Sequence, residues 1–170
     1  MASDPLHSDL VTRHYADPTT NLGERILAAL RAAGKNVDTL SPDDLAPIDE
    51  FHVRGRAATI ELARAAKLDA GMHVLDVGSG VGGPSRCLAR DFGCRVTGID
   101  LTAAYCDAAT MLAQRAGLAD RITYRQADAL ALPFDAAAFD AVWTQHVAMN
   151  IVDKAALYRE MHRVLDRKST

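Results

Sequence analysis

Four glycines within six positions constrain the fold of this chain more than any other feature. They lie in the segment 78–83, which reads GSGVGG and directly follows the short, mostly apolar run 73–77. Glycines permit a sharp turn from strand to helix and leave room for a ligand against the backbone. A tight turn alone rarely needs so many, so the segment predicts a nucleotide-binding loop at the end of a buried parallel strand.

The rest of the chain from residue 70 alternates strand-like and helix-like segments. Strands are expected at four short runs, 73–77, 95–99, 122–126 and 139–144. Helices are expected at 84–92, at 103–116 and after Asp153, which can cap a last helix. This alternation predicts the α/β class, with a Rossmann-like parallel sheet flanked by helices and ligand-binding residues at the carboxyl ends of the strands.

The first 69 residues carry helix signals and no strand pattern. The apolar face of a first helix is expected to hold Leu22, Ile26, Leu27 and Leu30. A second helix should start at Ser41 and end quickly at Pro47, and a third should run over about 56–68 with Ile60, Leu62, Ala63 and Ala66 as its apolar positions. We therefore expect an arm and helical lid at 1–69 and a cofactor-binding core at 70–170.

Three aspartates mark the ends of the expected strands. Asp76 precedes the first glycine by two residues, where its charge suits a cationic, amine-bearing ligand. Asp100 ends the second strand and can accept hydrogen bonds from both hydroxyls of a ribose, although it could also cap the next helix. Asp128 follows the third strand and can accept a hydrogen bond from an adenine amino group. The glycines also fit the GxGxxG pattern of nicotinamide cofactors, which leaves a dinucleotide as a rival ligand.

Composition excludes several classes of function. The net charge is −3 and the 19 lysines and arginines are scattered, which argues against a nucleic-acid footprint. No apolar run reaches the roughly 20 residues of a membrane span. The three cysteines form no CxxC pair, so we expect reduced, packed thiols and a cytoplasmic location. The histidines lack metal-ligand spacing, and no metal is expected.

Five ordered blocks, taken together, resemble the class I S-adenosylmethionine-dependent methyltransferases over about residues 70–165. The blocks are Val74–Gly83, Gly98–Asp100, Asp128–Leu130, Leu132–Phe134 and Phe139–Asp140. Within that class the chain most resembles the small-molecule branch of sarcosine/dimethylglycine and phosphoethanolamine N-methyltransferases. The resemblance implies S-adenosylmethionine as cofactor, S-adenosylhomocysteine as product, and methyl transfer to a nitrogen or oxygen nucleophile of a small molecule.

The same resemblance implies which residues form the site. The cofactor-binding residues it implies are Asp76, Gly78, Ser79, Gly80, Gly82, Asp100, Leu101, Asp128, Ala129 and Gln145. Substrate-side or catalytic roles fall on His146, Asn150 and Tyr15, with His146 either a base or only a hydrogen-bonding contact. Phosphoethanolamine enzymes tend to carry an acidic residue and a histidine where this chain carries His146 and Asn150, so the resemblance does not extend to the acceptor.

The carboxyl end departs from the resembled pattern. The segment Glu160–Leu165 resembles the helix that leads into a fifth strand, and the family has three further strands, whereas this chain ends at Thr170. The fourth strand is then expected to be an open edge, which could pair two copies of the chain. Two other functions stay open, namely a cofactor-binding remnant without turnover and an NAD-dependent oxidoreductase.

Overall fold

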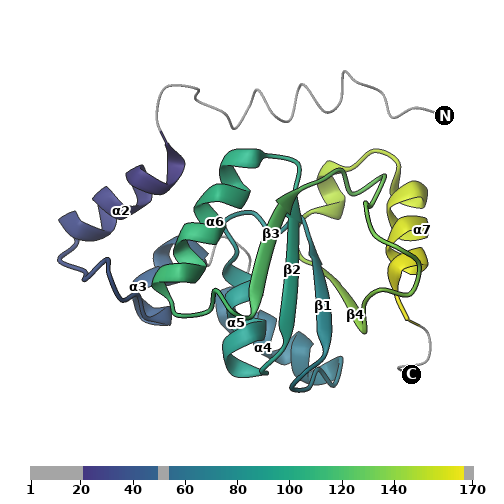
Figure 1. Cartoon of the computed structure of the whole chain (residues 1–170), viewed down its shortest axis with the longest axis horizontal. Coiled ribbons are helices and arrows are strands. Elements are labelled where there is room, and N and C mark those ends of the chain that lie inside the picture. The colour runs from purple at the N-terminus through teal and green to yellow at the C-terminus, as the bar shows by residue number, and fades with distance from the viewer. Residues whose placement is uncertain (1–20, 50–53, 167–170) are drawn as a thin grey trace.

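Four parallel strands form the centre of the molecule in the computed structural model, which describes residues 21–49 and 54–166 (Figure 1). The strands are β1 (His73–Val77), β2 (Arg95–Asp100), β3 (Ile122–Gln126) and β4 (Ala141–Thr144). The sheet order is β3-β2-β1-β4, and every neighbouring pair is parallel. This architecture confirms the predicted Rossmann-like α/β class.

Helices cover both faces of the sheet because its central strands are apolar on both sides. They are α4 (Gly55–Ala65), α5 (Gly83–Asp91), α6 (Ala103–Arg115) and α7 (Lys154–Val164). Val74 and Val96 belong to a core cluster with residues of α4, α5 and α6, whereas Leu75 and Val77 pack with α7. Successive strand residues point to opposite faces, so Asp76 shares a face with Val74 and is directed at α5.

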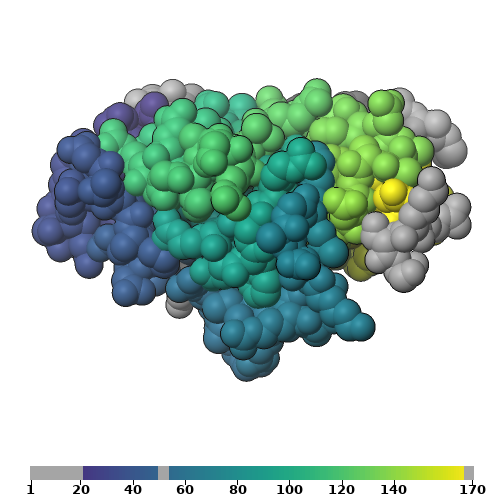
Figure 2. Space-filling view, turned by 60° about the horizontal axis from the view of Figure 1, so that its bottom comes forward, coloured from purple at the N-terminus to yellow at the C-terminus, as the bar shows by residue number. Residues whose placement is uncertain are grey.

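Two helices before α4 extend the layer that contains α6. They are α2 (Leu22–Ala32) and α3 (Pro42–Asp49), and their buried leucines form a third cluster with Leu112 of α6. Asn21 caps α2 by accepting a hydrogen bond from the Gly23 N–H (3.0 Å), and Ser41 and Asp44 cap α3 reciprocally. Helices α2 and α7 lie at opposite ends of the molecule (Figure 1), and the N-terminal helices are continuous with the core on the face shown in Figure 2. A domain division at residue 70 stays a prediction.

Three expectations about the helices and strands are wrong. Helix α3 continues through Pro47 to Asp49, because the buried Leu45 and an ion pair between Asp49 and Arg86 compensate for the one backbone hydrogen bond that proline removes. Leu62 is 48% exposed, since α4 packs through the small residues Thr59 and Ala63. Strand β4 starts two residues later than expected. The prediction that the cysteines are packed is confirmed, since all three are buried.

Strand β4 forms one edge of the sheet within the described residues. The segment just before β4 is paired on this open side. Phe139 makes a parallel bridge to Leu165, and its carbonyl accepts a hydrogen bond from the Asp166 N–H (2.8 Å). Association of two copies through this edge stays a prediction. In the part of the chain that the structure describes, no helix combines the length and the apolar character that crossing a membrane requires.

Candidate functional site

A cavity of about 770 Å³ lies where the four strands end, within the size range of ligand pockets in proteins. Each strand contributes lining residues from the segment that follows it or from its last residue. The predicted residues that line the cavity are Gly78, Gly80, Asp100, Leu101, Asp128, Ala129, Gln145, His146 and Asn150. The structure therefore brings together most of the site predicted from sequence. Tyr15 lies outside the described residues.

The glycine loop between β1 and α5 forms the floor of this cavity. Gly78, Gly80 and Gly82 have φ angles of 75°, 53° and 85°, a backbone conformation that other residues adopt at a cost. The N–H groups of Gly78 and Ser79 both donate to the Ile99 carbonyl, at 2.8 and 2.9 Å. A Cβ at Gly80 would meet nothing within 4 Å, so this part of the loop is open to a ligand.

Asp100 and Asp128 present their carboxylates to the cavity from β2 and from the loop after β3. The two oxygens of Asp100 accept hydrogen bonds from the N–H groups of Gly80 (3.0 Å) and Thr102 (2.9 Å). Burial raises the pKa of Asp100 despite these bonds. Asp128 accepts a hydrogen bond from the Leu130 N–H (2.8 Å). A carboxylate has about four acceptor sites, so each group keeps capacity for a ligand donor.

Three predicted site residues, one on β1 and two within the loop, are buried and do not line the cavity. The Asp76 carboxylate is 1% exposed and accepts a hydrogen bond from the Ser85 hydroxyl of α5 (2.5 Å). Burial above all, with a smaller contribution from the charge of Asp100, raises its pKa to about 6, although the Ser85 hydrogen bond acts in the opposite direction. Ser79 is buried, and its Oγ has no hydrogen-bond partner among the described residues. Gly82 leaves room for the Tyr124 ring, which a Cβ would strike.

The segment after β4 forms the wall nearest to the glycine loop. Gln145 accepts a hydrogen bond from Thr59 of α4 (3.2 Å), which ties this wall to the N-terminal helices. His146 has a φ of 58°, unusual for a residue with a side chain and frequent at functional sites. His146 and Asn150 do not share one helix, because Asn150 ends the short 3-10 helix η1 (Ala148–Asn150), which starts after His146. Both residues nevertheless line the same cavity.

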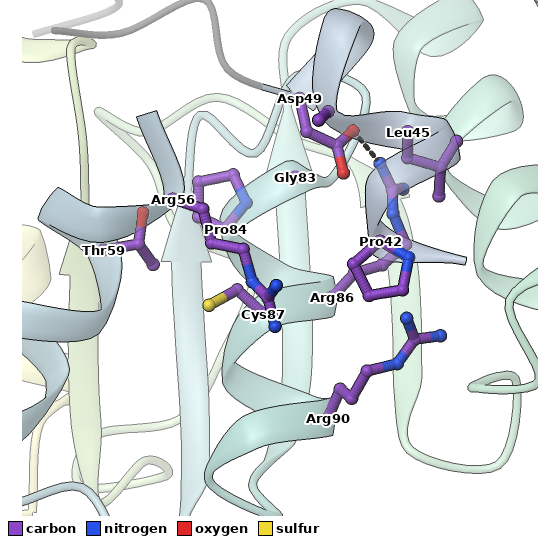
Figure 3. A pocket seen from close by; sticks show the side chains of 11 residues that line it. Pro42, Leu45, Asp49, Arg56, Thr59, Gly83, Pro84, Arg86, Cys87 and Arg90 are labelled. Carbon is purple, nitrogen blue, oxygen red and sulfur yellow. Dashed lines mark hydrogen bonds and ion pairs between the residues drawn. The ribbon is translucent and has the colours of Figure 1, made fainter. Parts of the chain in front are cut away.

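A second, much smaller pocket of about 30 Å³ lies between α3, α4 and α5 (Figure 3). Arg86 fills its deep side, pairing with the Asp49 carboxylate and donating to the Val81 carbonyl (2.7 Å). A Cβ at Gly83 would lie 2.9 Å from the Asp49 Cβ, so α3 covers the first turn of α5 closely. The volume suits about one water molecule, which excludes this pocket as a cofactor site.

Several lining residues are absent from the sequence prediction. They are Leu22, Ile26, Ile48, Val81, Ile99, Thr102, Tyr105, Ala127, Leu130, Val147 and Ile151. A signal existed for two of them, because Leu22 and Ile26 are four residues apart on the predicted apolar face of α2. That face is divided in the structure, since Leu27 and Leu30 enter the core while Leu22 and Ile26 line the cavity.

Known proteins match this chain in sequence. A family model described as a methyltransferase domain matches residues 75–170. Methyltransferase GfsG of Streptomyces halstedii is 35% identical over 122 residues, 72% of this chain and 44% of that protein. The chloroplastic tocopherol O-methyltransferase of Arabidopsis thaliana is 41% identical over 91 residues, 54% of this chain and 26% of that protein. The chain thus spans less than half the length of these curated relatives.

Solved structures also resemble it. The [4+2]-cyclase SpnF has a TM-score of 0.70 at 27% identity, and the match covers 93% of this chain and 56% of that one. A Galdieria sulphuraria structure described as a sarcosine dimethylglycine methyltransferase has a TM-score of 0.61 at 30% identity, covering 65% of this chain and 41% of that one. Both matches agree with the fold class that the sequence motifs indicate, and the second also agrees with the branch.

The buried carboxyl of Asp76 predicts a specific pH dependence of stability. Its folded-state pKa of about 6 lies above the usual aspartate value of 3.8, so the protonated group stabilises the fold below pH 4, and this contribution is lost as the pH rises through 6. Asp76→Asn cannot ionise, so the variant should not lose this stability as the pH rises. Its free energy of unfolding relative to wild type should rise by roughly 3 kcal/mol between pH 4 and pH 7 in urea denaturation.

Ser85→Ala provides the second arm of this experiment. The Ser85 hydroxyl lowers the pKa of Asp76, so removing it should enlarge the loss of stability with rising pH and extend that loss to higher pH than in wild type. Parallel stability curves for wild type and Asp76→Asn across this pH range would contradict the assignment.

Proposed function

The chain belongs to the methyltransferase domain family, and on that premise we propose that its cavity binds S-adenosylmethionine and that the protein transfers the methyl group to a small molecule. The observation that carries the proposal is the meeting of Asp100, Asp128 and the open glycine loop in one cavity. The chain matches less than half the length of its relative GfsG, so the activity of a complete protein is also part of what we propose.

Each part of the cofactor has a matching part of the cavity. The Asp100 carboxylate would accept hydrogen bonds from the ribose hydroxyls, and Asp128 from the adenine amino group, with Leu101 and Ala129 as apolar walls of the adenine site. The methionine end would lie against Gly78 and Gly80, close to Gln145. Asp76 would support the loop from below and add negative charge beneath a cationic ligand, while Ser79 and Gly82 are buried parts of the loop itself.

The start of α5 favours this cofactor over a dinucleotide. A pyrophosphate binds at the N-terminus of the helix that follows the glycine loop, where free amides and the helix dipole attract it. In this chain Asp49 covers that position, packed on Gly83 and paired with Arg86. A second anion there would meet a carboxylate in a space of about 30 Å³. S-adenosylmethionine has no phosphate and avoids this conflict.

Calorimetric titration of the chain with S-adenosylhomocysteine and with NAD tests this proposal. We expect saturable binding of the first ligand and none of the second. Asp100→Asn should weaken the affinity by about 10- to 100-fold, the effect of losing hydrogen bonds to a charged acceptor. Asp107→Asn, which changes an exposed carboxylate on α6, is the matched control and should leave the affinity unchanged. Binding of NAD alone would overturn the proposal.

The charge of the cavity lining indicates the class of acceptor. Once the cofactor takes Asp100 and Asp128, the described lining residues hold no other carboxylate and no lysine or arginine. Leu22, Ile26 and Ile48 add an apolar wall from α2 and α3. A carboxylate or phosphate on the acceptor would lack a partner there, and a buried unpaired charge is costly. We therefore infer an uncharged, largely apolar acceptor with a hydroxyl nucleophile, of the kind named for the tocopherol relative.

An acceptor panel tests this inference with the wild-type chain. We expect methyl transfer, measured with S-adenosylmethionine labelled in its methyl group, to alkyl-substituted phenols and hydroquinones. Sarcosine and phosphoethanolamine, which carry charges, should give none. Turnover of the charged amines alone would contradict the apolar acceptor. Binding of S-adenosylhomocysteine without turnover of any compound would instead favour the alternative of a cofactor-binding remnant.

The chemistry asks little of the protein beyond position and proton removal. When bound, S-adenosylmethionine would supply a methyl group on a cationic sulfur. The acceptor oxygen would bond to the methyl carbon while the sulfur keeps the electron pair of the broken carbon–sulfur bond. The glycine loop and Asp100 hold the donor, while the apolar wall excludes water from the acceptor. We propose that a ring nitrogen of His146 takes the hydroxyl proton, with Asn150 orienting the acceptor and Tyr15 contributing from the N-terminal arm.

His146→Gln separates proton removal from cofactor binding. Loss of a general base should lower kcat by about 10²- to 10⁴-fold, with the Kd for S-adenosylhomocysteine within about threefold of wild type. His162→Gln, the same change at an exposed histidine of α7, serves as control. A kcat near the wild-type value would show that His146 is only a contact residue.

A further inference from the structure

The loop between β3 and β4 carries part of the proposed cofactor site without secondary structure of its own. Asp128, Ala129 and Leu130 line the cavity, yet residues 127–138 form neither helix nor strand. Such a segment lacks the regular backbone hydrogen bonds that fix a helix or a sheet, so its position depends on other contacts.

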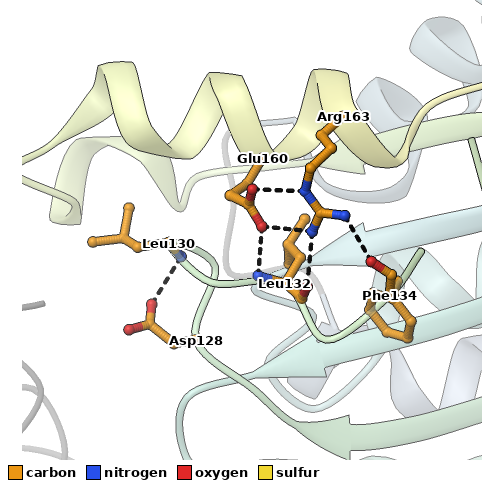
Figure 4. A network of polar contacts seen from close by, with 6 residues as sticks. All are labelled: Asp128, Leu130, Leu132, Phe134, Glu160 and Arg163. Carbon is orange, nitrogen blue, oxygen red and sulfur yellow. Dashed lines mark hydrogen bonds and ion pairs between the residues drawn. The ribbon is translucent and has the colours of Figure 1, made fainter. Parts of the chain in front are cut away.

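Two side chains of α7 provide these contacts (Figure 4). Glu160 accepts a hydrogen bond from the Leu132 N–H at 2.8 Å, and Arg163 donates to the carbonyls of Leu132 (2.8 Å) and Phe134 (2.7 Å). Arg163 also donates from two nitrogens to the two Glu160 oxygens, at 2.8 and 2.7 Å. Both backbone polar groups of Leu132 are therefore held by one ion pair on a rigid helix.

The held residue is connected to Asp128 by a short path. Leu132 is 4% exposed and belongs to the core cluster that contains Leu157 of α7. Two residues earlier the Leu130 N–H donates to the Asp128 carboxylate at 2.8 Å. A shift of the backbone at Leu132 would therefore move the donor that orients Asp128.

We propose that Glu160 and Arg163 are positioning residues for the adenine end of the cofactor, which fix the backbone at Leu132 and Phe134 and thereby hold the Asp128 carboxylate against the adenine amino group. The inference rests on the proposed function, because it takes the cavity as the site of an adenosyl ligand. It adds a role for α7, which contributes no residue to the lining of the cavity.

Other contacts also attach this loop to the core, so we expect variants that lack the ion pair to fold. Phe134 packs edge-on against Phe139 with ring centroids 5.0 Å apart, and Phe139 is 2% exposed in the core. These contacts keep the far part of the loop attached when Arg163 is changed. The part near Asp128 is expected to lose its fixed position.

The test compares two ligands that differ at one group of the adenine ring. S-adenosylhomocysteine carries the 6-amino group, and S-inosylhomocysteine carries an oxygen in its place. The Kd of each is measured by calorimetry for wild type, Arg163→Gln and Glu160→Gln. Arg115→Gln is the matched control, because Arg115 likewise pairs with a carboxylate and donates to a loop carbonyl, those of Asp38 and Val37, away from the cavity.

We expect wild type to prefer the adenosyl ligand, and both variants at the ion pair to reduce this preference by about tenfold, the effect of losing one hydrogen bond to a charged group. Arg115→Gln should keep the wild-type preference even if it is less stable. If the variants bind both ligands more weakly by the same factor, the ion pair has a merely structural role. That result would overturn this inference but leave the proposed function standing. A wild-type ratio near one would also overturn it. A wild-type chain that binds neither ligand would overturn the proposed function as well.

Discussion

The attachment of the glycine loop to the end of β2 is the interaction on which the rest of the site depends. Two loop amides share the Ile99 carbonyl, and a third, that of Gly80, donates to Asp100. These bonds hold a turn in which Gly78 and Gly80 have positive φ angles, which L residues resist, and they fix the carboxylate of Asp100 at the cavity wall. Parallel pairing in register then brings the ends of β1, β2 and β3 to the same edge, so that residues far apart in sequence share one cavity.

Sequence reasoning succeeded where the local pattern and the fold impose the same requirement. The run His73–Val77 is mostly apolar and is followed directly by Gly78, and it forms a strand with the predicted bounds. Asp100 and Asp128 were predicted because the residues after parallel strands meet at one edge. Sequence reasoning failed where tertiary contacts decide the local structure. Pro47 is tolerated inside α3, and the helical period could not tell which half of the α2 face enters the core.

The largest gap concerns the residues that act through others. Glu160 and Arg163 are three apart, a spacing that predicts an ion pair along a helix, but nothing in the sequence reveals that their partners are the backbone groups of Leu132 and Phe134. The position of Asp76 was predicted, whereas its complete burial was not, because that depends on the packing of Ser85. The absence of further charged side chains from the described cavity lining was also not predictable, because the lining residues come from many separate segments of the chain.

A crystal structure of the chain with S-adenosylhomocysteine tests the central claim most directly. The account predicts ribose hydroxyls within hydrogen-bond distance of the Asp100 carboxylate and an adenine amino group donating to Asp128, with the amino-acid end over Gly78 and Gly80. A ligand bound elsewhere, or one that leaves both carboxylates without contact, would contradict it.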